Sequence, residues 1–143
     1  MKKVFKLTCL IVATSITMSS CGVIFGGAKY SGSIIAKDHS DAKIYVNGNK
    51  VGKGTSIGLY PRNRPLTVQL KQDGCEDKTV TFDNTFRGGN FVLSLITWGL
   101  VGVIVDLATG ASYKPDHKSN PAIQKTDMKN FVFTVDYSEC KIN

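Results

Sequence analysis

The chain has 143 residues, of which 18 are lysine or arginine and 11 are aspartate or glutamate, giving a formal net charge of +7. Hydrophobic residues make up 42% of it, glycine occurs 14 times and proline four times. This composition predicts a single small folded domain and excludes a disordered chain or a collagen-like repeat.

The first twenty residues are typical of a secretory signal. Lys2, Lys3 and Lys6 form a basic start, residues 7–18 are mostly apolar, and small residues follow at 19–20. The apolar stretch is too short for a comfortable membrane span. A buried N-terminal helix is the competing interpretation, and the order of basic, apolar and small segments favours the signal.

Met18, Ser19, Ser20 and Cys21 resemble the lipobox of bacterial lipoproteins, with Met18 in place of the usual leucine. The resemblance implies that residues 1–20 are removed as a signal peptide, that the Cys21 thiol carries a diacylglycerol, and that its new amino group is acylated, for example with palmitate. Such a set of chains exceeds what stable anchoring needs. The residue after Cys21 is glycine, not the aspartate that retains such proteins at the inner membrane. This favours attachment to the outer membrane, facing the periplasm.

The remaining cysteines predict a disulfide. One cysteine leaves with the signal and Cys21 is lipidated, so Cys75 and Cys140 remain as a pair in an oxidising compartment. We predict that these two are bonded, with two buried free thiols as the alternative. Neither has a second ligand at zinc spacing, and His39 and His117 stand alone in the sequence, so we expect no metal site.

Residues 31–82 alternate apolar and polar side chains, as strands with one buried face do. Asn47-Gly48 and Asp73-Gly74 are hairpin-turn signals. After a lipidated tether at 21–30, we therefore expect a mainly β domain at 31–143, a small antiparallel β-sandwich or meander. Extended segments are predicted at 33–36, 42–46, 49–53, 55–60, 66–71 and 79–82, and a last strand at 130–137.

This region resembles the PEGA domain, a small β-sandwich module of bacterial envelope proteins. The residues that carry the resemblance are 42–48 (AKIYVNG), Gly52, 66–70 (LTVQL) and 73–75 (DGC). The Pro-Glu-Gly-Ala element itself is absent, and Cys75 replaces the aromatic residue after the second turn. The resemblance covers about fifty residues and implies a fold more than a function.

An apolar insertion at about 91–108 interrupts the strand pattern. Residues 91–105 carry no charge, and as one helix they would reach about 22 Å, less than the ~30 Å of a bilayer core. The segment has three interpretations: two short helices split near Trp98 and packed over the sheet, a hairpin dipping into the membrane interface beside the lipid, or a central strand. In the second, Trp98 lies at headgroup level, and Trp98, Leu100 and Val101 contact the membrane or a partner.

The segment after the insertion offers no clear site. Residues 106–115 resemble a stretch found in small envelope lipoproteins, and we expect Asp106 and Thr109 to cap a helix end and hold a turn. Residues 114–127 are polar with two prolines and predict a loop. The dense polar cluster at 38–41 (DHSD) is typical of a solvated turn. No HExxH motif or phosphate-binding glycine loop occurs in the sequence.

We therefore expect a lipid-anchored protein of the bacterial cell envelope, without enzymatic activity or cofactor. It would act as a binding or structural module that docks on another envelope protein or on a cell-wall component. Removing the three lysines of the signal from 18 basic residues leaves 15 against 11 acidic ones, scattered along the chain, so we expect no nucleic-acid partner. The alternative is a membrane-active or exclusion lipoprotein that uses residues 91–107 to engage a membrane protein.

Overall fold

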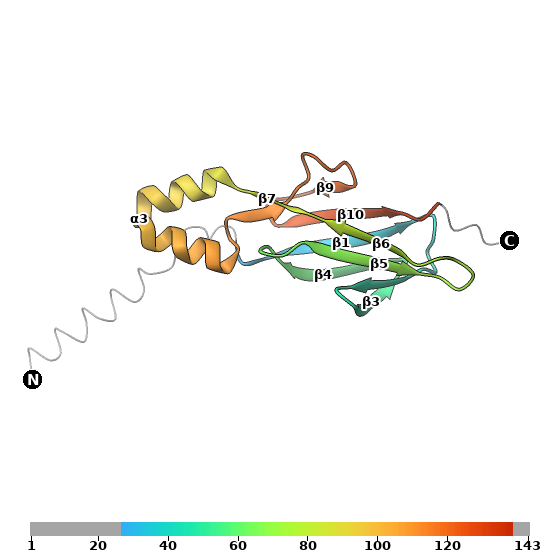
Figure 1. Cartoon of the computed structure of the whole chain (residues 1–143). Coiled ribbons are helices and arrows are strands. Elements are labelled where there is room, and N and C mark those ends of the chain that lie inside the picture. The colour runs from blue at the N-terminus through green and yellow to red at the C-terminus, as the bar shows by residue number, and fades with distance from the viewer. Residues whose placement is uncertain (1–26, 139–143) are drawn as a thin grey trace, which may run out of the picture.

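A computed structural model describes residues 27–138, apart from the side chains of Asn90, Thr97 and Trp98 (Figure 1). The predicted signal peptide at 1–20, the lipidation residue Cys21 and the disulfide partner Cys140 lie outside the described residues. The elements are β1 (Lys29–Lys37), β2 (Lys43–Val46), β3 (Asn49–Lys53), β4 (Thr55–Pro61), β5 (Leu66–Lys71), β6 (Lys78–Phe82), β7 (Asn84–Phe86), α3 (Gly88–Thr109), β8 (Tyr113–Pro115), β9 (Ile123–Lys125) and β10 (Asn130–Asp136).

Most strands join one sheet, in the order β6-β5-β2-β3-β4-β1-β10-β9, while β7 and β8 form a separate two-stranded ribbon. Neighbouring strands of the large sheet are antiparallel, except for β1 and β10, which run parallel. The expectation of antiparallel pairing throughout is therefore wrong at this pair. β10 returns only after α3 and a polar loop, and a connection of that length is what a parallel pair requires.

The core lies between the two halves of the sheet, which face each other. Phe82 of β6 and Phe133 of β10 have ring centroids 5.1 Å apart, although they belong to opposite parts of the strand order. Tyr30 of β1 packs edge-on against Phe131 at 5.5 Å. Buried and half-exposed residues alternate along β1, β5 and β10, which confirms the mainly β prediction. We call the strands β1–β10 together the β body.

The predicted turns occur where the sequence places them. Asn47 and Gly48 both have positive φ, 49° and 85°, as the tight turn between β2 and β3 requires. Asp73 and Gly74 lie in the connection between β5 and β6. Two bounds differ from expectation: β1 begins at Lys29, inside the predicted tether, and β9 lies inside the predicted loop at 114–127.

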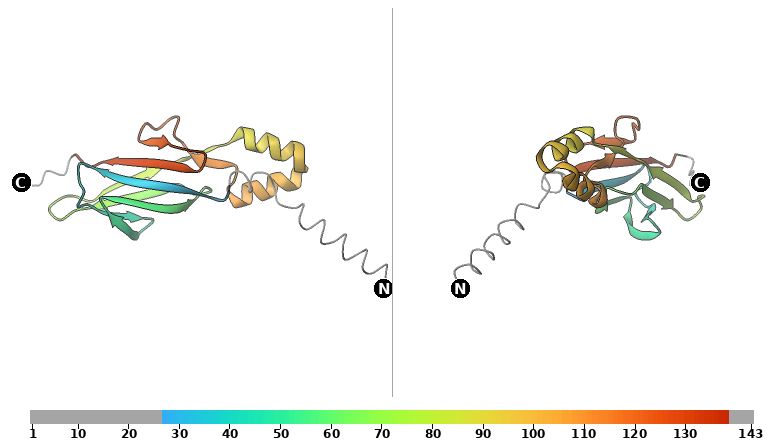
Figure 2. Two further views of the ribbon diagram at one scale, coloured as in Figure 1. Left: turned by 180° about the vertical axis from the view of Figure 1, so that it is seen from behind. Right: turned by 60° about the vertical axis from the view of Figure 1, so that its left-hand side comes forward.

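The apolar insertion lies in α3, which consists of two helical arms separated by a sharp break. Gly99 has φ 60° and ψ −151°, a conformation that is essentially restricted to glycine, so the helix reverses there. We call residues 88–109 the helical hairpin. It projects beyond one end of the β body, as Figure 1 and the left-hand view of Figure 2 show. The prediction of two helices split near Trp98 is confirmed, but their packing over the sheet is wrong, and so is the central strand.

The start of β1 lies at the same end as the helical hairpin. The backbone N–H of Arg62, just after β4, donates to the Ala28 carbonyl at 3.0 Å. Gly110, which ends α3, lies against Asn63, so closely that a Cβ there would stand 2.8 Å from the Asn63 nitrogen. We call this end of the β body the hairpin end. The opposite end, with the turn at 38–42 and the end of β10, is the far end.

Candidate functional site

The helical hairpin buries polar side chains and exposes most of its large apolar ones. Its buried residues are Ser94, Gly102, Val103 and Asp106. Its large exposed apolar residues are Val92, Leu93, Leu95, Ile96, Leu100, Val101, Ile104 and Leu107. Ile96 and Leu100 are 76% and 75% exposed. A helix that packs on a protein core in water buries its apolar stripe and exposes its polar face. The helical hairpin does the reverse.

The two arms are joined by a buried polar pair. The Ser94 hydroxyl on the first arm donates to a carboxylate oxygen of Asp106 on the second, and both residues are fully buried. The expectation that Asp106 caps the helix end is therefore wrong, because its side chain bridges the arms instead. Thr109 does bond to the backbone, donating to the Val105 carbonyl at 2.8 Å, as predicted.

Two of the three predicted contact residues fall on this exposed apolar surface. Leu100 and Val101 are both exposed on the second arm, whereas the Trp98 side chain lies outside the described ones. Contiguous apolar surface of this kind marks a contact with a membrane or a partner. Within residues 27–138, no helix has the length and apolar character needed to cross a membrane.

Two arginines meet where the helical hairpin joins the β body. Arg62 is fully buried, lies over the Tyr30 ring at 5.8 Å, and donates from Nη1 to the Tyr113 carbonyl at 3.4 Å. Burial, followed by repulsion from Arg87, lowers the pKa of Arg62 to about 10. Nε and Nη2 of Arg62 and Nη1 of Arg87 are buried without a hydrogen-bond partner in the described part of the chain. A buried cation in this situation is costly.

Charge is distributed unequally between the two ends. The strand register and the contacts of the adjoining loops place the following basic side chains at the hairpin end: Lys29, Arg62, Arg64, Arg87, Lys114, Lys118, Lys125 and Lys129. The acidic side chains there are Asp83, Asp106, Asp116 and Asp127. At the far end the two kinds balance, and the ion pairs found among described residues all lie there: Lys43–Asp73, Lys53–Asp41 and Lys71–Asp77. The excess of positive charge is therefore confined to the hairpin end.

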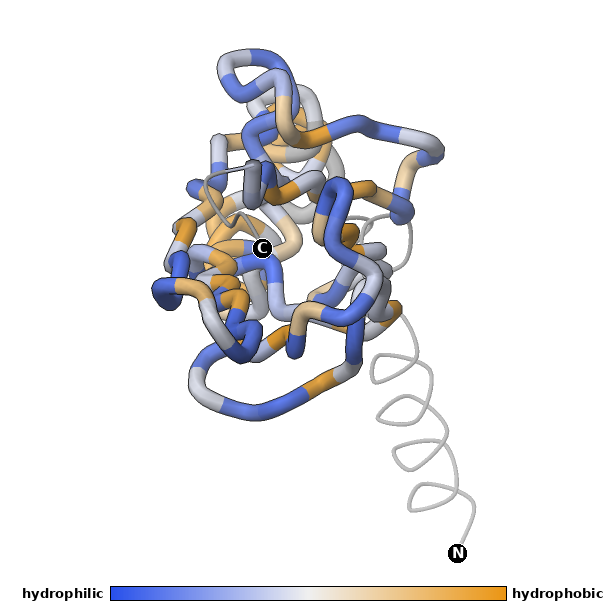
Figure 3. The backbone as a smooth tube through the Cα atoms, turned by 90° about the vertical axis from the view of Figure 1, so that its right-hand side faces the viewer, coloured by the Kyte–Doolittle hydropathy of each residue, from blue (hydrophilic) through white to orange (hydrophobic). Residues whose placement is uncertain are grey.

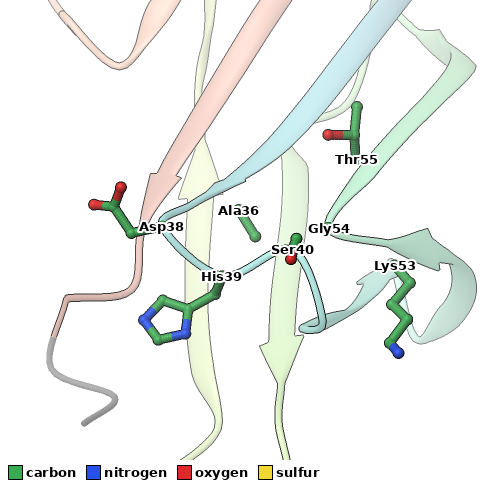
Figure 4. A pocket seen from close by; sticks show the side chains of 7 residues that line it. All are labelled: Ala36, Asp38, His39, Ser40, Lys53, Gly54 and Thr55. Atoms are coloured by element: carbon green, nitrogen blue, oxygen red, sulfur yellow. The ribbon is translucent and has the colours of Figure 1, made fainter. Parts of the chain in front are cut away.

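The far end carries an open hollow of about 510 Å³. It lies around the 38–41 cluster that the sequence singled out, and Figure 4 shows its lining: Ala36, Asp38, His39, Ser40, Lys53, Gly54 and Thr55. Figure 3 looks onto this end, where the turns are mostly hydrophilic. The volume falls in the range of small-ligand sites, but such sites are usually enclosed and apolar. The hollow therefore fits a docking surface better than a closed ligand site.

The polar groups of the hollow are held by neighbours. His39 Nδ1 lies 3.1 Å from Gln72 Oε1, and its ring meets the Tyr137 ring edge-on at 5.2 Å. The hydrogen bond from Lys53, and then its charge, lower the pKa of Asp41. In the part of the chain that the structure describes, no three histidine, cysteine or acidic side chains gather as metal ligands.

Cys75 lies beside the end of the last strand. It is half-buried against the core, and the Tyr137 hydroxyl donates to the carbonyl of the next residue, Glu76, at 2.7 Å. Cys140, only three residues after Tyr137, lies outside the described residues. The disulfide stays a prediction. The contact between Tyr137 and Glu76 supports it, because Cys75 and Cys140 are close in sequence to these two residues.

Comparison of the chain with protein-family models, with curated proteins and with solved structures finds no match. The resemblances to the lipobox and to the PEGA domain therefore stay predictions that rest on the residues quoted for them.

Sequence reasoning missed the two features that define the hairpin end. Ser94 and Asp106 are twelve positions apart, a separation without meaning until Gly99 is known to reverse the helix. Arg62 and Arg87 come from different loops, and only the fold brings them together. The signal that could have found Arg87 is its place directly before an uncharged run of residues, 88–105.

Proposed function

We propose that this protein is a lipid-anchored component of the bacterial envelope that attaches to the outer membrane by two adjacent devices. One is the acyl group on Cys21. The other is the helical hairpin, which enters the leaflet beside it. The β body is then a binding or structural module that faces away from the bilayer. The observation that carries this proposal is that the helical hairpin, at the end where β1 begins, exposes its apolar side chains and buries the bonded Ser94 and Asp106.

The lipid and the helical hairpin can reach the same leaflet. Cys21 precedes Gly27 by six residues, and six extended residues span at most about 21 Å. Each arm of the helical hairpin has about eleven residues and is therefore roughly 16 Å long. One leaflet contributes about half of the ~30 Å hydrocarbon core. The arms are thus long enough to enter one leaflet and too short to cross both.

The buried polar pair supports a lipid environment for the same surface. Ser94 and Asp106 satisfy each other between the arms, so the outer surface offers lipid only apolar side chains. Interhelical hydrogen bonds and small residues such as Gly102 are what hold helices together in membranes. A helical hairpin that remained in water would expose Ile96 and Leu100 at a cost that no contact in residues 27–138 offsets.

The far end is available for docking because it points away from the hairpin end. Its turns are hydrophilic and its ion pairs are exposed. The open hollow around His39 is a concave surface that a partner could fill. A partner in the periplasm or the cell wall would meet this end first. The module thus presents one end to lipid and the other to another envelope component.

Photo-cross-linking in cells tests both halves of this proposal. A benzophenone amino acid at Leu100 is expected to give lipid adducts, and one at Thr55, in the hollow, a discrete adduct with an envelope component. The same residue at Ile57, which is 75% exposed on β4, controls for apolar exposure and is expected to give no lipid adduct.

Other adducts at Leu100 would overturn the lipid assignment. A discrete membrane-protein adduct would favour the alternative, in which the helical hairpin engages and blocks a membrane protein. An adduct with a second copy, or with residues 1–26 of the same chain, would mean that the apolar surface is covered by the protein itself.

A further inference from the structure

We propose that the basic surface at the base of the helical hairpin, centred on Arg87 and Lys114, binds the phosphate of an anionic phospholipid. This inference rests on the proposed insertion of the helical hairpin and adds the class of lipid that the site recognises. Four observations carry it: the position of the two side chains, the charge around them, the lack of a counter-charge, and their height along the hairpin.

Arg87 and Lys114 lie on one face of the β7–β8 ribbon. Thr85 pairs with Lys114 in that ribbon, and the Arg87 N–H extends the ladder by donating to the Ser112 carbonyl at 2.7 Å. Because side chains two apart on a strand share a face, Arg87 and Lys114 are diagonal neighbours. The glycines that follow Arg87, Gly88 and Gly89, leave open space beside it. One phosphate has room to contact both cations.

Further basic groups surround the pair. Burial lowers the pKa of Lys114, and repulsion from Lys118, Lys125 and Arg87 lowers it further, against the smaller opposing effect of Asp116. Arg62 lies behind Arg87, buried, and close enough to repel it. Guanidinium groups are suited to phosphate because their forked N–H donors match its oxygens.

The described chain supplies no counter-charge for the two arginines. No acidic side chain in residues 27–138 forms an ion pair with Arg62 or Arg87, and three of their N–H groups are buried without an acceptor there. The N-terminal segment 1–26 contains no aspartate or glutamate at all. A buried guanidinium requires an anion or another acceptor. Because no acidic side chain of residues 27–138 pairs with the two arginines and residues 1–26 hold none, we infer an anion from outside this part of the chain.

The position of Arg87 and Lys114 along the helical hairpin indicates which anion they would contact. Arg87 immediately precedes α3, at the base of arms roughly 16 Å long. When the arms fill one leaflet, about 15 Å of hydrocarbon, their base lies at the level of the lipid phosphates. Lys114 follows the end of the second arm by five residues and lies at the same level.

Energy transfer from Trp98, the one tryptophan of the chain, measures this preference. The lipid-anchored protein is placed in phosphatidylcholine vesicles that contain either dansyl-labelled phosphatidylglycerol or dansyl-labelled phosphatidylcholine, each labelled on its acyl chain. We expect several-fold enrichment of the glycerol lipid, because each basic side chain near an anionic surface contributes a factor of about five. Arg87→Gln with Lys114→Gln is expected to remove the enrichment.

A matched control separates this site from general charge. Lys43→Gln with Lys53→Gln removes the same charge at the far end, where both lysines form exposed ion pairs, and should keep the enrichment. Equal loss in both variants would overturn the proposal. So would displacement of the labelled lipid by inorganic phosphate, because the site would then take the free ion.

The two proposals fail separately in this experiment. Quenching of Trp98 by brominated phosphatidylcholine, in vesicles without anionic lipid, reports insertion alone. Quenching without enrichment would contradict the phosphate site and leave insertion standing, whereas absent quenching would contradict the proposed function itself.

Arg62→Met provides a second test, which does not depend on substituting Arg87 or Lys114. If Arg62 lacks a counter-ion until lipid binds, replacing it with an apolar side chain of similar length should leave the melting temperature unchanged or raise it. The enrichment of phosphatidylglycerol should fall in the same variant. A lower melting temperature with unchanged enrichment would make Arg62 a structural residue of the β body and overturn this part of the inference.

Discussion

The β body and the helical hairpin use apolar residues in opposite ways. In the β body, rings such as Phe82 and Phe133 face inward and are fully buried. In the helical hairpin, Ser94 and Asp106 face inward, and apolar side chains such as Leu100 face outward. The comparison teaches that apolar content alone does not define a core. What matters is whether the apolar side or the polar side of an element meets its neighbour.

The same contrast holds for charge. At the far end of the β body, exposed lysines pair with exposed aspartates, as they do on an ordinary wet surface. At the hairpin end, Arg62 is buried and has two N–H groups without an acceptor in residues 27–138. The far end is thus suited to water, and the hairpin end, as we propose, to an anionic lipid surface.

The largest expected effect separates the two regions by stability. Phe133→Ala should lower the free energy of unfolding by about 3–5 kcal/mol, because it opens a cavity in the core. Leu100→Ala should change it by less than about 0.5 kcal/mol, because Leu100 is 75% exposed. Urea denaturation of both variants without vesicles measures this. Equal losses would mean that Leu100 is buried in solution, and the contrast would break.

The predicted disulfide is the next largest contribution, and it belongs to the β body alone. A bond between Cys75 and Cys140 would stabilise by roughly 4 kcal/mol in the chain-entropy model, and by less if strained. Reductant should therefore lower the melting temperature of the wild type as much as Cys75→Ser does, and should not affect Trp98 fluorescence in vesicles. A melting temperature that reductant leaves unmoved would contradict the bond.

A smaller effect is expected at the polar pair inside the helical hairpin. Ser94→Ala removes the hydroxyl that donates to Asp106, at a cost of about 1–3 kcal/mol for a buried hydrogen bond. The loss should appear as faster amide hydrogen exchange in residues 91–107, with the β body unchanged. Ser33→Ala, on the half-exposed face of β1, is the control. Unchanged exchange in Ser94→Ala would show that the pair does not hold the arms together.

The strands of the fold could be predicted from sequence because their signals are local. Alternation along residues 66–71 and the Asn47-Gly48 turn depend only on neighbouring residues, and both appear as expected. The parallel pairing of β1 with β10 could not be predicted, because it joins segments a hundred residues apart. Nothing near either strand in the sequence specifies the direction of its partner.

The candidate site was predictable only in part for the same reason. The uncharged run at 91–105 and its break near Trp98 were evident in the sequence, and Leu100 and Val101 are exposed on that segment. Which side of each arm faces the other depends on the reversal at Gly99. The meeting of Arg62 with Arg87 depends on the whole β body, so neither could be derived from spacing.

The most direct measurement is quenching of Trp98 fluorescence by brominated lipids in vesicles that hold the lipid-anchored protein. The account predicts strong quenching and a blue-shifted emission for the wild type, and for Ile57→Asp with Leu59→Asp, which alters equally exposed apolar residues on β4. Ile96→Asp with Leu100→Asp should lose the quenching, because charge cannot enter the hydrocarbon cheaply. Water-like emission and no quenching in the wild type would contradict insertion of the helical hairpin.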